Sequence, residues 1–465
     1  MMLIVITIFT ACLLVCPRTV SGQTISFKGN VASSESGIAL ESAAVRSNNS
    51  GVYTNADGSF KLFVSKQGLI SVSHVGFSTI SIASDTLTDN KDYKILLRPA
   101  ITELNEITIN ARIIKAEEIV TKAIGNLPHL LDNNEFVLEA LYRQTHYSII
   151  PSVNVKKYTY FSEAAVLLHH LMSESTYQPI VKEIRRSNDS RYSSYNRVTS
   201  DDIAKEERRL ELANGFLELD YTRYREPLKT DNLFWNPNPI LCRLDRRFVK
   251  SHEFSVDSIV SWDNKDVFVI RVLPSKRSKK VETYLGVSPY VPEGLLYITD
   301  EDFHILEFHY AYVNKQTYSS NNLSANLLQY VSQGDYFFKD VVKYRMYNNK
   351  LYLSYFMREA RDNTYGGGLN ESGLVKSQSV DEDDFRYYRL KRELIVNRIN
   401  TDTKTLSASY LTPRYKTLFP KVYEYNKTFW MNFNTTLIDK LEKKILDDLG
   451  QGISLEKQFE INQNK

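Results

Sequence analysis

Apolar and polar residues alternate over long stretches of this chain, and short turns interrupt the alternation. Between residues 25 and 97, apolar side chains such as Ile25, Phe27 and Leu62 occupy every second position, and turn residues recur about every 8–12 residues. A period of two places alternate side chains on one face of a β-strand. The pattern therefore predicts about seven short strands, packed as a sandwich, and no helix in this stretch.

One turn in this stretch has a specific chemistry. The segment Asn55-Ala56-Asp57-Gly58 lies between the strand-like runs Val52–Thr54 and Phe60–Val64. Asp-Gly between strands is a strong hairpin signal, because glycine adopts positive φ without strain. The sequence therefore predicts a hairpin here. It does not predict a calcium site at Asp57, because no further carboxylate alternates with it.

Several spaced motifs in residues 23–100 belong together. They are Ile25–Val31, Gly37–Leu40 with Ala43-Ala44-Val45, Gly51–Phe60, Val72–Phe77, and Leu96–Pro99 with Leu104–Ile107. In this order and spacing they resemble the carboxypeptidase regulatory-like domain. The resemblance implies a transthyretin-like, carbohydrate-binding-like sandwich without catalytic residues. Such domains are frequent at the N-termini of Bacteroidetes outer-membrane receptors and related envelope proteins.

The first 22 residues have the pattern of an export signal. Residues 2–15 form a nearly continuous apolar run, too short for a membrane span and suitable for a signal-peptide core. Val20 and Gly22 suit a signal peptidase site, so residues 1–22 are expected to be a signal peptide. The mature protein is then expected in the periplasm or associated with the outer membrane.

The cysteines and the charge exclude other classes of protein. Lipidation at Cys16 or Cys12 is a weaker alternative, because the large Val15 precedes Cys16 and only a very short apolar run precedes Cys12. Cys242 is the remaining cysteine, so no intrachain disulfide is expected after cleavage. The net charge is +3 with both signs interspersed, which argues against nucleic acid as a partner. The basic run 276–280 is interpreted as a solvated loop.

The rest of the chain is expected to be a second, larger β-rich unit. Residues 101–134 are interpreted as a linker and a helix, because apolar residues recur there at helical spacing. Residues 135–465 are expected to form a domain of unknown function. Strand patterns within them, interrupted by turns such as those at 263–266, 299–302 and 348–350, predict a large antiparallel sheet that is curved or a half-barrel. These patterns are residues 136–142, 158–161, 248–254, 256–262, 267–272, 295–298, 304–310, 342–346 and 351–356.

The C-terminal part differs from this strand pattern. Residues 363–384 are interpreted as a flexible loop. A stripe that includes Leu441, Ile445 and Leu449 predicts a helix, and Gly450 suits its C-terminal cap.

Short motifs of this larger unit also recur in a known group of proteins. They are Glu117–Ala123, Tyr142-Arg143-Gln144, Ser162-Glu163-Ala164, Arg185-Arg186-Ser187 and Ser454–Phe459. They resemble the uncharacterised C-terminal region of Bacteroidetes carboxypeptidase-like regulatory domain-containing proteins, which has no assigned activity. The strand pattern is also compatible with the half-barrel of periplasmic lipoprotein carriers, as a likeness of fold only.

No catalytic, cofactor-binding or metal-binding residue is expected. His304 and Glu307 form an H-x-x-E, but positions three apart on a strand lie on opposite faces, and His309 is the last histidine of the chain. His169-His170 is interpreted as part of a helix or strand surface. The acidic run 381–384 is interpreted as a solvated loop. No cofactor is therefore expected.

These observations favour a non-enzymatic envelope protein with a binding or scaffolding role. The chain has 30 tyrosines. Tyrosine suits a sheet face that recognises a glycan, a peptide or an envelope protein. Membrane association stays open, but no segment after the signal is long enough to span a bilayer. Two alternatives stay open: a lipid or lipoprotein carrier with an apolar cavity between sheet and helix, and a hydrolase with a site assembled from residues 135–420.

Overall fold

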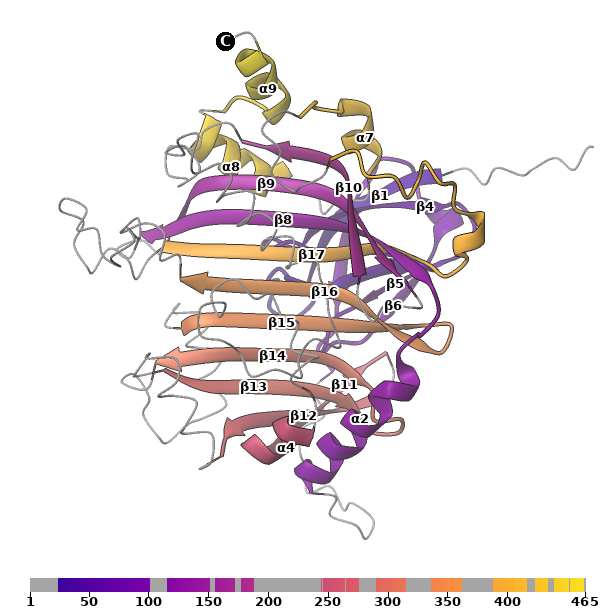
Figure 1. Cartoon of the computed structure of the whole chain (residues 1–465), viewed down its shortest axis with the longest axis vertical. Coiled ribbons are helices and arrows are strands. Elements are labelled where there is room, and N and C mark those ends of the chain that lie inside the picture. The colour runs from indigo at the N-terminus through magenta and orange to yellow at the C-terminus, as the bar shows by residue number, and fades with distance from the viewer. Residues whose placement is uncertain are drawn as a thin grey trace, which may run out of the picture.

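The computed structural model describes most of the chain outside its termini and several connecting segments. The described ranges are 24–100, 115–150, 155–171, 177–187, 244, 246–263, 265–275, 290–314, 336–361, 388–415, 423–433, 439–450 and 452–463. The signal segment, Cys242, the basic run 276–280 and the loop 363–384 with its acidic run lie outside these ranges. Within them the fold is mainly β, as the alternation predicted: a small sandwich lies against a large, curled half-barrel sheet (Figure 1).

The sandwich has seven strands in two sheets. One sheet has the order β4-β1-β7. The other has the order β3-β2-β5-β6 and continues into the large sheet, because Ser50 of β3 pairs with Arg398 of β17. Its core comes from the alternate apolar positions of the sequence, including Ile25, Phe27, Leu62 and Val72. The strands are β1 (Thr24–Ser33), β2 (Ala44–Ser47), β3 (Ser50–Tyr53), β4 (Ser59–Ser65), β5 (Leu69–Ser73), β6 (Ile80–Ala83) and β7 (Asp92–Leu97), with a 3₁₀ turn η1 (Ser84–Thr86).

The hairpin predicted at Asp57-Gly58 is wrong. β3 pairs with β2 and β4 pairs with β1, so this turn carries the chain from one sheet of the sandwich to the other. The turn chemistry itself is as expected: Gly58 has φ +78°, and Asp57 Oδ1 accepts hydrogen bonds from the Ser59 amide and hydroxyl. A local signal identified the turn, but long-range pairing with β1 decided its partners.

The large sheet contains ten described strands, each antiparallel to its neighbours. Their order is β11-β12-β13-β14-β15-β16-β17-β8-β9-β10. The strands are β8 (Phe136–Ile150), β9 (Val155–His170), β10 (Tyr177–Arg186), β11 (His252–Trp262), β12 (Lys265–Pro274), β13 (Tyr290–Thr299), β14 (Ile305–Asn314), β15 (Tyr336–Tyr347), β16 (Lys350–Arg361) and β17 (Tyr388–Asn400). The predicted turns at 263–266, 299–302 and 348–350 connect successive strands.

The two faces of this sheet differ in chemistry and in what covers them. One face is apolar, and α2 (Ala116–Leu130) and α4 (Arg246–Ser251) pack on it near β11–β13 (Figure 1). The sandwich packs on the other face, which we call the charged face. The strand predicted at 248–254 is therefore wrong in its first half, because residues 246–251 form α4 and place Phe248 in the apolar core.

Three helices in the described residues follow β17 and a 3₁₀ turn, η9 (Thr403–Thr405). They are α7 (Lys427–Asn432), α8 (Asp439–Gly450) and α9 (Leu455–Gln463). The predicted apolar stripe of α8 packs through Ile445 and Leu449 beside β8 and β9. Gly450 is the last residue of α8, and the glycine with positive φ beyond the helix is Gly452. None of the described helices has the length and apolar composition of a membrane span.

Candidate functional site between the sandwich and the charged face

The charged face carries buried ionic side chains at positions that alternate with core residues. Arg143 follows Tyr142, Glu307 precedes Phe308, and each core neighbour points to the apolar face. Burying so many charges is costly unless each one finds a partner. The buried ionic side chains of this face include Arg143, Glu163, Arg185, Arg271, Glu293, Glu307, Lys343, Arg345, Glu359, Arg389 and Glu393.

Glu163 shows how this cost is met. Its side chain is 0% exposed, and its two carboxylate oxygens bind two different arginines. Arg143 Nε lies 2.6 Å from Glu163 Oε1, and Arg185 Nη2 lies 2.6 Å from Oε2. Burial alone would raise the pKa of Glu163, but the charges of Arg185 and Arg143 outweigh burial and lower it. Three of the short motifs singled out in the sequence therefore meet in one ion cluster.

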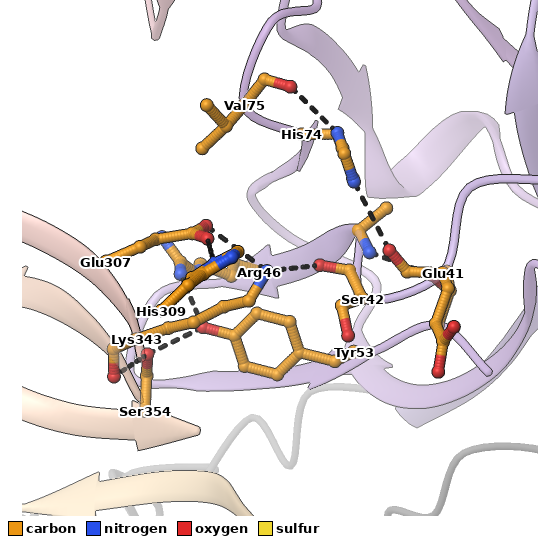
Figure 2. A network of polar contacts seen from close by, with 12 residues as sticks. Glu41, Ser42, Arg46, Tyr53, His74, Val75, Glu307, His309, Lys343 and Ser354 are labelled. Atoms are coloured by element: carbon orange, nitrogen blue, oxygen red, sulfur yellow. Dashed lines mark hydrogen bonds and ion pairs between the residues drawn. The ribbon is translucent and has the colours of Figure 1, made fainter. Parts of the chain in front are cut away.

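A second group of contacts joins the sandwich to the charged face (Figure 2). Lys343 Nζ on β15 lies 3.2 Å from Glu307 Oε1 on β14 and donates to the Ser42 carbonyl of the sandwich at 3.1 Å. Burial would raise the pKa of Glu307, but Lys343 and a hydrogen bond from His309 lower it to about 2. Glu307 is therefore a fixed anion at neutral pH, and it holds Lys343 toward the sandwich.

Tyr53 makes the next contact across the same boundary. Its hydroxyl lies 2.6 Å from Ser354 Oγ, and Ser354 Oγ donates to the Lys343 carbonyl at 3.0 Å. Since the Ser354 proton is used, the Tyr53 hydroxyl donates to Ser354 and accepts from Arg46 Nη2 at 2.9 Å. Nearby, the backbone carbonyl of Asn49 in the sandwich accepts a hydrogen bond from Arg345 Nη2 at 2.7 Å.

His74 lies on the sandwich side of this boundary. Its Nδ1 is 2.9 Å from the Val75 carbonyl, and its Nε2 is 3.2 Å from the Glu41 carbonyl. A neutral imidazole can donate only one of these bonds. Burial and the nearby charge of Lys343 lower the pKa of His74, so the neutral ring is favoured at neutral pH.

A cavity of about 390 Å³ lies between the two units beside these contacts. The sandwich contributes residues 41, 42, 74 and 75, and the large sheet contributes β9 and β13–β17. On its wall Glu359 lies among Lys339, Lys156 and Lys391. Burial would raise the pKa of Glu359, but these three charges and a hydrogen bond from Tyr147 lower it to about 2. The cavity wall is therefore ionic, with its carboxylates held as anions.

An adjoining cavity of about 590 Å³ is more apolar. Ile38, Leu40 and Phe77 of the sandwich line it together with Val260 and Val269 of the large sheet. The two cavities share three lining residues, namely Val75, Leu295 and Tyr297. The boundary between the units therefore presents an ionic hollow that adjoins an apolar one.

The structure does not bring His304 together with Glu307 and His309. Glu307 and His309 lie on the same face of β14, and His309 Nε2 is 2.9 Å from Glu307 Oε2. His304 precedes β14, where its amide donates to Thr299 Oγ1. No cluster of three metal-ligating side chains occurs among the described residues.

The prediction that His169 and His170 lie on a surface is wrong. The prediction allowed a helix or a strand, and both residues lie in the strand β9. Both side chains, however, are buried. His169 Nε2 lies 2.7 Å from Glu135 Oε1, and the His170 ring stacks on Phe136 at 4.7 Å.

Most tyrosines in the described part of the large sheet are buried, and Tyr297, Tyr310 and Tyr355 line the cavity at the boundary. Tyr142, Tyr147, Tyr344, Tyr352 and Tyr355 are all buried. Their rings fill the core, and their hydroxyls bind polar neighbours such as Glu359, 2.6 Å from the Tyr147 hydroxyl. Composition could not separate a buried tyrosine from a binding one.

The ionic residues of this boundary were missed as a site by the sequence analysis. A signal does exist: Glu307, Lys343 and Glu393 are charged residues inside strands that otherwise alternate toward a core. Such residues would ordinarily be assigned to a solvated face. Only strand order and the docking of the sandwich show that this face is covered.

Comparisons with known proteins give distant likenesses. No family model matches the sequence, and no curated protein does. Solved structures that align include a DUF1329 family protein from Desulfovibrio piger, with 7% identity, 64% of this chain and 98% of that chain covered, and a TM-score of 0.25.

Two further structures have similar coverage. A putative outer membrane lipoprotein-sorting protein domain from Vibrio parahaemolyticus has 8% identity, covers 63% of this chain and 96% of its own, and has a TM-score of 0.23. A LolA superfamily protein from Nitrosomonas europaea has 10% identity, covers 64% and 98%, and has a TM-score of 0.21. Identities and TM-scores this low transfer neither a ligand nor an activity.

Proposed function

We propose that this chain is a non-enzymatic binding protein of a bacterial envelope, and that it holds a small ligand between its sandwich and its charged face. The observation that carries the proposal is the cavity of about 390 Å³ at this boundary. Ligand sites are typically hollows of about 300–1,000 Å³ between domains, with a few fixed polar groups. Glu307, Lys343 and Ser42 supply such groups, already oriented by one another.

The electrostatics of the cavity favour binding over hydrolysis. A general base works best when its pKa lies near the working pH. The pKa values of Glu307 and Glu359 are both lowered to about 2, chiefly because adjacent lysines outweigh their burial. These carboxylates are therefore suited to holding a ligand by charge rather than to accepting a proton at neutral pH.

The envelope location rests on the sequence. The apolar run of residues 2–15 has the length of a signal-peptide core, and residues 23–100 resemble a domain that is frequent in envelope proteins. The seven-stranded sandwich is compatible with that resemblance. In this proposal the sandwich is one wall of the binding site, and the large sheet is the other.

Filling the junction of the two cavities tests the proposal. Val75 lines both, so Val75→Trp should occlude the site. The purified protein would be incubated with separate lipid, glycan and peptide fractions of a bacterial envelope, recovered by gel filtration, and its bound molecules identified by mass spectrometry. We expect one fraction to leave a bound molecule on the native protein and none on Val75→Trp.

Leu69→Trp is the matched control, because Leu69 is an exposed residue of the sandwich that lines neither cavity. It should retain the bound molecule. Equal retention by Val75→Trp, or no retention from any fraction by the native protein, would overturn the proposal.

A further inference from the structure

The cavity is lined by four lysines and four carboxylates, and these lysines differ in how they are paired. Lys339, Glu359 and Lys391 are directly opposite one another on β15, β16 and β17. Lys156 of β9 lines the same cavity, so three ammonium groups surround one carboxylate. Lys391 also pairs with Glu393 at 3.0 Å and with Glu41 at 3.5 Å, and Lys339 pairs with Glu359 at 3.6 Å.

Lys156 differs from the other two lysines. Among the described residues its ammonium has no carboxylate within ion-pair distance, and it lies over the Tyr147 ring, 4.8 Å from the ring centroid. Although Lys156 is exposed overall, desolvation at the cavity and the charges of Lys391 and Lys339 outweigh the attraction of Glu359 and Glu41 and lower its pKa. An anion bound here would relieve this repulsion, and it would reach the cavity without displacing an existing ion pair of Lys156.

The apolar cavity lies at one side of this lysine cluster. It is bounded by β11–β13, while the lysines lie on β15, β17 and β9. Strands β13 and β15 are two positions apart in the sheet, and β13 and β17 are four apart. At a strand spacing of about 4.8 Å, Lys339 and Lys391 are roughly 10 and 19 Å from β13 along the sheet, and Lys156 on β9 is roughly 29 Å away along the sheet. Lys156 nevertheless lines the same cavity as Leu295 and Tyr297 of β13. One extended molecule can therefore reach from one region to the other.

We infer that the ligand of this site is an anionic amphiphile with an acyl chain, whose charged head contacts Lys156 and Lys339 and whose chain occupies the apolar cavity. The inference rests on the proposed function and specifies its ligand. Charge complementarity selects the head, and the apolar lining from Ile38, Val260 and Val269 selects the chain. A phosphate or a carboxylate head has the chemistry that lysine ammoniums bind.

Four related probes test this assignment by calorimetric titration below their micelle concentrations. They are myristoyl lysophosphatidic acid, myristate, monomyristoylglycerol and glycerophosphate. We expect the two anionic amphiphiles to bind, and the neutral amphiphile and the chainless phosphate to bind at least about tenfold more weakly. The ratio between the first two distinguishes a phospholipid source from a free fatty acid.

Two substitutions with matched controls locate the probe. Lys156→Gln should weaken binding of lysophosphatidic acid about tenfold and leave monomyristoylglycerol unchanged. Lys157→Gln, the next residue on the same strand, points to the other face and should change neither. Ile38→Asp should weaken both amphiphiles, whereas Ile461→Asp on α9 should not.

The outcomes separate this inference from the proposed function. If glycerophosphate binds as tightly as lysophosphatidic acid, or Lys156→Gln has no effect, the amphiphile assignment is wrong. If no probe binds while an envelope fraction leaves another molecule that Val75→Trp excludes, the binding function stands and the ligand class is overturned. If no molecule binds in either experiment, both fail.

Discussion

Single ionic side chains stabilise this protein only through their partners. Glu163 is fully buried, and its charge is balanced by Arg143 and Arg185 at 2.6 Å each. In a buried cluster, desolvation largely offsets the attraction, so the intact cluster contributes modestly to the free energy of unfolding. Removing one member is different, because the remaining charges stay buried without the partner that compensated them.

We therefore predict that Glu163→Gln lowers the free energy of unfolding by roughly 3–5 kcal/mol. The amide keeps the shape of the carboxylate but removes the charge that Arg143 and Arg185 share. Urea denaturation followed by circular dichroism measures the change. Glu118→Gln, at an exposed position in the first turn of α2, should cost less than about 1 kcal/mol. Equal losses in the two variants would contradict the role given to the cluster.

At the scale of the element, turns in this fold depend on close backbone approach as much as on φ. Gly58 and Gly37 both have positive φ, at +78° and +68°. A Cβ at Gly58 would lie 2.4 Å from the Val31 carbonyl oxygen, whereas a Cβ at Gly37 would meet nothing within 4 Å. The Val31 amide donates to the Gly58 carbonyl at 2.9 Å, which holds the turn against β1.

Alanine at these two glycines separates the two effects. Gly37→Ala should cost about 1–2 kcal/mol, the usual penalty for a left-handed residue with a side chain. Gly58→Ala should lower the free energy of unfolding by more than this, because β1 or the turn must also move to separate the new Cβ from the Val31 carbonyl. Thermal and urea unfolding of the two variants measure the difference. If Gly58→Ala lowers the free energy of unfolding no more than Gly37→Ala does, the backbone near Val31 can move without a cost in stability.

At the scale of the whole molecule, the sandwich and the large sheet are joined by specific polar contacts. The Tyr53 hydroxyl links Arg46 of the sandwich to Ser354 of β16. We predict that Tyr53→Phe costs about 1–3 kcal/mol, because buried partners of the hydroxyl lose it. Hydrogen exchange should quicken both in residues 42–53 and in residues 343–354, since one contact constrains both units.

Tyr93→Phe is the control for this coupling. Its hydroxyl accepts from the Thr88 amide at 2.8 Å, entirely within the sandwich. Exchange should quicken in the sandwich and stay unchanged in β15 and β16. If Tyr53→Phe leaves exchange in the large sheet unaltered, the two units are not coupled through this contact.

Much of the secondary structure was predictable because its causes are local. Alternating apolar residues identified the strands, and Asp263, Asn348 and Asn349 adopt positive φ at two turns of the large sheet that the sequence predicted. Residues 248–254 failed, since a helical turn that buries Phe248 is equally compatible with that short apolar pattern. The site could not be predicted, because its residues come from strands up to several hundred positions apart.

The sequence by itself determined a mainly β protein with two β-rich parts and strands that each carry one apolar face. These properties follow from side-chain periodicity and turn chemistry, which act over a few residues. Tertiary structure alone decided that the sandwich covers the charged face, that Glu163 meets two arginines, and that four lysines border a cavity. Those outcomes depend on strand order and domain docking, because the energetic effect of a buried charge depends on partners that are distant in the chain.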